Sequence, residues 1–126
     1  MDMVLLIVQG VVALVFLGAG LMKLRTPYAA MVADSKMDWV KAYSPGFVRF
    51  LGLAEILGGL GLILPRVTGV APLLVPVAAA GLLVIMLGAI GTHLRRKEGP
   101  MVVPPLLLAL VLGYLLYRSL PLLPPT

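Results

Sequence analysis

Four long apolar blocks divide this chain, and they constrain its fold more than any other feature of the sequence. The blocks cover about residues 3–22, 46–64, 68–92 and 103–117. A helix rises about 1.5 Å per residue, so it needs about 20 mostly apolar residues to cross the hydrocarbon core of a bilayer. The sequence therefore predicts an all-α fold, an integral membrane four-helix bundle that forms a single domain over residues 1–126.

The low content of charged residues supports a membrane protein over a soluble one. Only 12% of the residues are charged and 61% are hydrophobic, whereas a soluble domain carries about 25% charged residues. The chain has no cysteine, which excludes disulfides, thiolate metal sites and dithiol redox chemistry within it. Because one histidine and a few dispersed acids do not make a transition-metal ligand set, no metal is expected.

The first apolar block and the polar stretch that follows it each carry a further signal. The block at 3–22 lacks the basic start and the small-residue cleavage site of a signal peptide, so we expect a retained first span. The polar stretch 24–45 fits either a plain loop or a short amphipathic helix in the membrane interface, and the predicted fold includes the amphipathic segment. Its apolar residues recur at roughly helical spacing: Tyr28, Met31, Val32, Trp39 and Tyr43.

The distribution of basic residues predicts the orientation. Basic side chains gather beside two of the three connections, while the opposite side has only Arg66 and Arg118; the first group is Lys23, Arg25, Lys36, Lys41, Arg49, Arg95, Arg96 and Lys97. Cytoplasmic loops carry an excess of Lys and Arg. We therefore expect a multi-pass protein of the bacterial inner (cytoplasmic) membrane with both termini on the non-cytoplasmic side. This placement accounts for the net charge of +5 without a nucleic-acid partner.

The third block contains two prolines in its first half, Pro72 and Pro76. A proline inside a helix removes a backbone hydrogen bond and bends the helix. We therefore expect a kink in the third span and backbone carbonyls that neighbouring helices must satisfy.

The most informative single residue is Glu55, in the middle of the apolar run FLGLAEILGGLGLILP. An acid at the centre of a membrane helix costs about 2.5–3.5 kcal/mol on insertion scales, and its short side chain cannot reach the interface. Glu55 must therefore be protonated, paired, or lining a polar cavity. Lys23 and His93 end the first and third spans on the cytoplasmic side and are candidate partners. Arg49 lies about 120° around the helix from Glu55, which argues against a direct contact.

We therefore predict a ligand-binding site made of Glu55, His93, Lys23 and Arg49. Three of these residues also have a structural interpretation that stays open. Glu55 would then be a neutral acid hydrogen-bonded to a carbonyl freed by the kinked third span, Lys23 a topology determinant, and His93 an ordinary interfacial histidine.

Three stretches carry a resemblance to a known family: FLGAGLMKL at the end of the first span, LGLAEILGGLGLILP in the second, and APLLVPVAAAGLLVIMLGAIGTHLRRKE in the third. In this order they resemble the DoxX-like family of small four-helix bacterial membrane proteins. The resemblance implies either a membrane subunit of an oxidoreductase complex, such as a thiosulfate:quinone oxidoreductase, or a membrane chaperone like the family's distant animal relatives.

Three functions follow from the residues and the resemblance together. The first is a membrane subunit of an oxidoreductase complex that binds a quinone around Glu55 and depends on a redox partner subunit, so that the chain is not an enzyme alone. The second is a non-catalytic assembly or binding protein for a lipid or a membrane-protein client. The third is a small proton-coupled transporter, which would require a homo-oligomer. Many small residues in the spans are also consistent with self-association.

Overall fold

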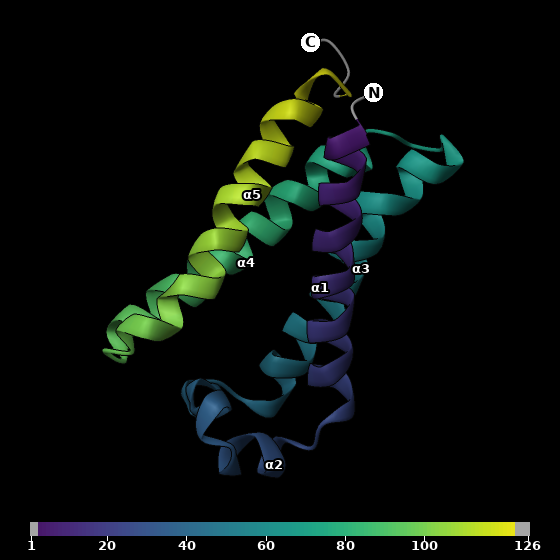
Figure 1. Ribbon diagram of the computed structural model, residues 1–126. Coiled ribbons are helices and arrows are strands. Elements are labelled where there is room, and N and C mark those ends of the chain that lie inside the picture. The colour runs from purple at the N-terminus through teal and green to yellow at the C-terminus, as the bar shows by residue number, and fades with distance from the viewer. Residues whose placement is uncertain (1–2, 123–126) are drawn as a thin grey trace.

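The computed structural model describes residues 3–122, apart from the side chains of Lys36, Arg66 and Leu122. The described chain is helical and contains no strand. Figure 1 shows the helices in sequence: α1 (Met3–Arg25), α2 (Tyr28–Ala33), η1 (Ser35–Ala42), α3 (Pro45–Thr68), α4 (Leu74–Arg95), η2 (Gly99–Val102), α5 (Val103–Ser119) and η3 (Leu120–Leu122).

Four helical stretches are long and apolar enough to cross a membrane: Met3–Arg25, Pro45–Pro65, Leu74–Arg95 and Gly99–Ser119. The predicted all-α membrane fold with four spans is therefore confirmed. The start of α1 and the end of α5 lie at one end of the molecule, and α2 lies at the other (Figure 1). Which end faces the cytoplasm stays a prediction.

The second and third spans differ from the sequence-based expectation at the connection between them. Helix α3 continues through Pro65 to Thr68 and ends at Gly69, whose left-handed φ of 73° suits a residue without a side chain. Helix α4 begins at Leu74 instead of near Thr68, so Pro72 precedes the helix and Pro76 falls in its first turn. A proline in the first turn has no backbone bond to lose. The expected kink is therefore absent from α4, and the prolines instead help to start it.

Glycines allow α1 and α3 to approach closely beside the position of Lys23. A Cβ atom added to Gly52 would lie 2.8 Å from the carbonyl oxygen of Gly20 and 2.9 Å from Cβ of Lys23. Helices in membranes associate through such contacts between small residues. The backbone contact between Gly20 and Gly52 therefore fixes where the end of α1 lies along α3.

The bundle has its apolar core toward the end where α1 begins and α5 ends. Helix α1 packs mainly against α3, α4 packs against both α3 and α5, and α1 makes few contacts with α5. The pair α4–α5 diverges from the pair α1–α3 toward the end where α2 lies (Figure 1). The core residues come from all four long helices and include Phe16, Leu62, Leu82 and Leu112.

The segment between the first two spans folds as two short helices, α2 and η1, where the sequence predicted a short amphipathic segment. Met31, Val40 and Val48 form a second, smaller apolar cluster there. The Tyr28 hydroxyl donates to a pair of backbone carbonyl oxygens, 2.9 Å away on Val40 and 2.7 Å away on Tyr43. These contacts hold η1 across the end of the α1–α3 pair.

Candidate functional site

Glu55 is paired with a cation. Nζ of Lys23, in the last turn of α1, lies 2.7 Å from Oε1 of Glu55 in α3. The two side chains are only 11% and 4% exposed. Oε1 accepts no well-aligned hydrogen bond despite this contact, so the carboxylate has acceptor capacity left for a further donor. Glu55 is therefore a buried, paired acid whose hydrogen bonding is incomplete.

The ion pair lies in the wall of a cavity of about 460 Å³. This volume is within the range of about 300–1,000 Å³ that is typical of small-molecule sites. Most of the lining is apolar and comes from α1, η1, α3, α4 and α5. The lining residues are Val15, Phe16, Ala19, Lys23, Trp39, Tyr43, Phe47, Phe50, Leu51, Glu55, Val84, Ile85, Met86, Gly88, Ala89, Thr92, His93, Pro104, Pro105 and Leu108.

Three of the four predicted site residues come together here, since Lys23, Glu55 and His93 all line the cavity. Arg49 is not among the lining residues and is exposed on α3. Gln9 is buried in a different layer of the bundle, where its Nε2 donates to the carbonyl oxygen of Leu62 at 3.0 Å.

His93 connects the cavity wall to the polar end of the molecule. Its Nδ1 lies 3.0 Å from Oε1 of Glu98, and its ring meets Trp39 edge-on, with 6.5 Å between the ring centroids. When one ring nitrogen of a histidine is engaged in a hydrogen bond, the other ring nitrogen remains available for a second partner. With Nδ1 held by Glu98, Nε2 is the nitrogen that remains for a molecule in the cavity.

A chain of charged side chains ties η1 to the end of α4. Nε of Arg96 lies 3.1 Å from Oε1 of Glu98, and its guanidinium also donates to Oδ2 of Asp38 at 2.6 Å. The hydrogen bond from Lys41, with the charges of Lys41 and Arg96, holds the pKa of Asp38 below its usual value. The pKa of Glu98 is lowered by the hydrogen bond from His93 and by Arg96. Both acids are therefore ionised at neutral pH.

The site predicted from the sequence did not include Trp39, Tyr43 and Thr92, which line the cavity near Lys23 and His93. The Trp39 ring lies 5.8 Å from Nζ of Lys23, within the range of a cation–π contact. Tyr43 donates a hydrogen bond to the hydroxyl oxygen of Thr92, which itself donates to the carbonyl oxygen of Gly88 at 3.0 Å. The helical spacing of aromatic residues in 28–43 was the available signal, although spacing alone does not reveal which side of η1 faces the bundle.

The site offers a hydrogen-bond donor, Nζ of Lys23, and an acceptor, Nε2 of His93, in a mainly apolar space. An ammonium group and an imidazole face a cavity whose other walls are aliphatic or aromatic, which suits a lipophilic molecule with polar oxygen atoms. Among the described residues, no three His, Asp or Glu side chains gather as a metal site would require.

Comparison with known proteins agrees with the architecture. No curated protein and no solved structure matches the chain. The model of the DoxX-like family matches residues 7–114, nearly the whole chain, which confirms the resemblance seen in the sequence: the protein is a multi-pass membrane protein that belongs to the DoxX-like family.

Proposed function

We propose that this protein is a membrane subunit of an oxidoreductase complex and that it binds a lipophilic ligand such as a quinone beside Glu55. The observation that carries the proposal is the buried ion pair of Lys23 and Glu55 in the wall of an apolar cavity. Ionisable residues inside membrane spans are costly and are commonly retained for function. The proposed location is the bacterial cytoplasmic membrane.

The residues of the cavity fit a quinone. A quinone headgroup is a planar ring with carbonyl oxygens, which need hydrogen-bond donors and flat apolar neighbours. The Lys23 ammonium group can donate to such an oxygen, Nε2 of His93 can accept from the hydroxyl of a reduced quinone, and Trp39 and Tyr43 supply aromatic walls. The incomplete hydrogen bonding of Glu55 further suits a ligand that carries a hydroxyl group, as a reduced quinone does.

The role of this chain would be to orient the ligand, exclude water and hold protons. A quinone, when bound, would accept two electrons and two protons. The electrons come from a redox partner subunit in this proposal, because the chain has no cysteine and a single histidine. Nζ of Lys23 holds protons at the cavity wall, and Glu55 balances the charge of Lys23. Nε2 of His93 can accept a proton there in the tautomer whose Nδ1 donates to Glu98. A positioned group of this kind contributes to proton transfer when its geometry is right.

The test uses the purified protein in lipid nanodiscs and a decyl-substituted benzoquinone as probe. We expect Glu55→Gln to insert and fold but to bind the probe at least about tenfold more weakly, because the Lys23 ammonium group loses the anion that holds it in the cavity wall as a donor to the quinone oxygens. Arg25→Gln is the control, since Arg25 is exposed near the same end of α1 and does not line the cavity. Equal binding by wild type and Glu55→Gln would contradict the proposal and favour an assembly protein with a structural Glu55.

A further inference from the structure

Four aromatic side chains form a continuous row along one side of the cavity. The rings of Trp39 and Tyr43 meet edge-on with centroids 6.1 Å apart, and Tyr43 stacks on Phe47 at 4.9 Å. Phe47 then contacts Phe50 at 6.2 Å. All four residues line the cavity. The row therefore joins the surroundings of Lys23 to the surface of α3 through contacts at the distances typical of aromatic pairs.

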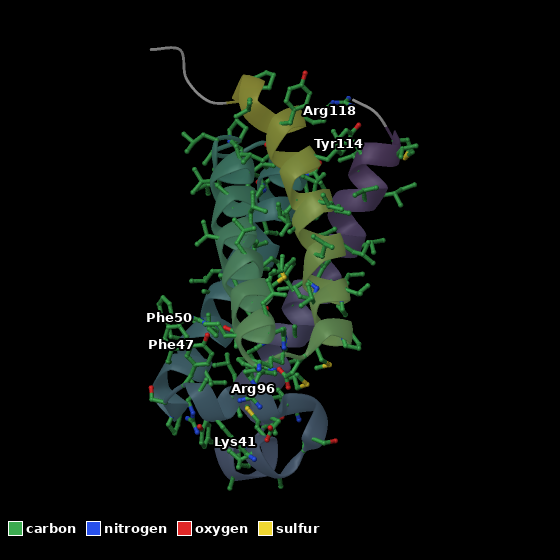
Figure 2. All side chains as sticks on the ribbon, turned by 90° about the vertical axis from the view of Figure 1, so that its left-hand side faces the viewer. Lys41, Phe47, Phe50, Arg96, Tyr114 and Arg118 are labelled. Carbon is green, nitrogen blue, oxygen red and sulfur yellow. The ribbon has the colours of Figure 1, made fainter. Side chains whose placement is uncertain are left out.

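Exposure rises along this row. Trp39 and Tyr43 are half-buried, whereas Phe47 is 41% and Phe50 62% exposed. Figure 2 shows Phe47 and Phe50 on one side of the molecule, above the polar end marked by Arg96 and Lys41. Because α3 is long and apolar enough to span a membrane, we expect these exposed rings to face the bilayer.

Helix α4 leaves space opposite the two phenylalanines. Gly88 lines the cavity and is exposed, and a Cβ atom added there would meet no other atom within 4 Å. Val84, one turn earlier on α4, also lines the cavity and is exposed. The cavity therefore reaches the lipid-facing surface between α3 and α4 at a position where no α4 side chain fills the space at Gly88.

We propose that this opening, bordered by Phe47, Phe50, Val84 and Gly88, is a lateral portal through which a ring-bearing lipophilic ligand enters from the bilayer. The aromatic row selects a planar ring and guides it to Lys23 and Glu55, since ring stacking favours a flat headgroup over an acyl chain. The inference rests on the proposed function, because it supplies the route and the selectivity of the same site.

The cavity has a second exposed border, which lacks the exposed aromatic rings of the portal. On the side between α1 and α5, Val15 and Pro104 line the cavity and are exposed. Among the described lining residues on that side, the one aromatic ring belongs to Phe16, which is buried. A ring entering there would meet no row of exposed aromatic side chains, which is why the α3–α4 side is the portal.

The experiment follows ligand entry with the protein's own fluorescence. Trp39 is the single tryptophan of the chain, and quinones quench tryptophan fluorescence. Stopped-flow mixing of nanodisc-embedded protein with decyl-substituted benzoquinone gives the association rate from the saturable part of the quenching. Unspecific quenching by quinone dissolved in the bilayer is measured with Trp39→Phe/Leu110→Trp, which carries its tryptophan on the exposed face of α5 away from the cavity.

A matched pair of glycines tests the portal itself. Gly81 and Gly88 are both exposed on α4, and a Cβ atom at either would meet nothing within 4 Å, but only Gly88 lines the cavity. We expect Gly88→Leu to lower the association rate about tenfold or more, because the side chain obstructs entry. Gly81→Leu should associate at the wild-type rate. Wild-type kinetics for Gly88→Leu, or slowing by Val15→Phe instead, would overturn the α3–α4 portal.

A second pair tests selection by the aromatic row. Phe50→Ala should weaken binding about threefold to tenfold, the value of one aromatic contact. Leu53→Ala, a similarly exposed position on α3 outside the cavity, should bind as wild type does. Competition by decanol as effective as by the quinone would overturn ring selection while leaving the cavity as a ligand site. An absence of any saturable quenching in wild type would instead contradict the proposed function together with the portal.

Discussion

The Lys23 ammonium group lies 2.7 Å from the Glu55 carboxylate, although the two residues belong to different membrane-spanning helices. The contact depends on the close approach of α1 and α3 at Gly20 and Gly52. It turns a costly intramembrane acid into one half of an ion pair, and it places both charges in the wall of a cavity.

The two members of the ion pair should differ in their effect on stability. Lys23→Met leaves a buried carboxylate without a cation, which costs about 3–5 kcal/mol in soluble proteins. Glu55→Gln leaves an ammonium group at a helix end, and its long stem can carry the charge back to the polar end. We therefore expect Lys23→Met to destabilise the protein by about 3 kcal/mol and Glu55→Gln by less than about 1 kcal/mol. Reversible unfolding in mixed detergent measures the free energy of unfolding of both variants. Equal losses of stability would contradict the conclusion that Glu55 is confined in the bundle whereas Lys23 can reach the polar end.

Glycine substitution should separate helix packing from general effects on α1. Gly20→Ala places a methyl group against the backbone of α3, which we expect to cost about 1–3 kcal/mol of stability and to move Lys23 away from Glu55. Gly18→Ala is the matched control, because a Cβ atom there meets nothing within 4 Å. The control should be neutral or slightly stabilising, since alanine favours a helix more than glycine does. Unfolding measurements that rank the two variants in the opposite order would refute the packing at Gly20.

Acidification should loosen the attachment of η1 to α4. The pKa values of Asp38 and Glu98 are lowered from 3.8 and 4.5. Groups of this kind contribute their full stabilisation above these ordinary values, and the contribution is lost as the pH falls through the lowered ones. We expect the fluorescence of Trp39 to shift to longer wavelength below about pH 4, as η1 separates from the bundle and water reaches the ring.

The variant Asp38→Asn should reproduce part of this shift at neutral pH, because it removes the negative partner of Arg96. A Trp39 emission that stays constant down to pH 3 and in Asp38→Asn would contradict the role of the Asp38–Arg96 contact.

The orientation predicted from the basic residues is tested by reporter fusions. Lys41 and Arg96 mark one end of the molecule, whereas Arg118 lies at the other, beside Tyr114 (Figure 2). By the positive-inside rule, alkaline phosphatase should be active at both termini, and a fluorescent protein inserted in the connection 96–100 should fluoresce. Cytoplasmic signals from both termini would reverse the orientation.

The sequence predicts the fold well because hydropathy and length decide it. Each apolar block can satisfy its backbone only as a helix, so four blocks give four helices whatever their detailed packing. Glu55 stands out for the same reason, since a central acid has few permitted environments. The predicted kink in the third span was wrong, because the effect of a proline depends on where the helix starts. Pro76 lies in the first turn of α4 and costs no backbone hydrogen bond, whereas the same residue further inside would bend the helix.

The sequence predicts the central acid of the site more easily than it predicts the residues around that acid. Depth along a span placed Lys23 and His93 toward the cytoplasmic side of Glu55, and both line the cavity with it. Arg49, which the sequence already rotates away from Glu55, lies outside the cavity, and whether these residues bind a ligand stays a prediction. The positions of Trp39 and Thr92 depend on how η1 folds back and on the divergence of α4 from α3. Both are tertiary features that no local pattern encodes.

A quinone site at Glu55 is tested most directly by mass spectrometry of the small molecules that co-purify with the protein from bacterial membranes. Wild type is compared with Glu55→Gln, and with Arg25→Gln as the control. A ligand bound at Glu55 predicts a quinone that is enriched in wild type and in Arg25→Gln and depleted in Glu55→Gln. The same phospholipid profile in all three proteins, with no enriched quinone, would contradict a quinone site at Glu55.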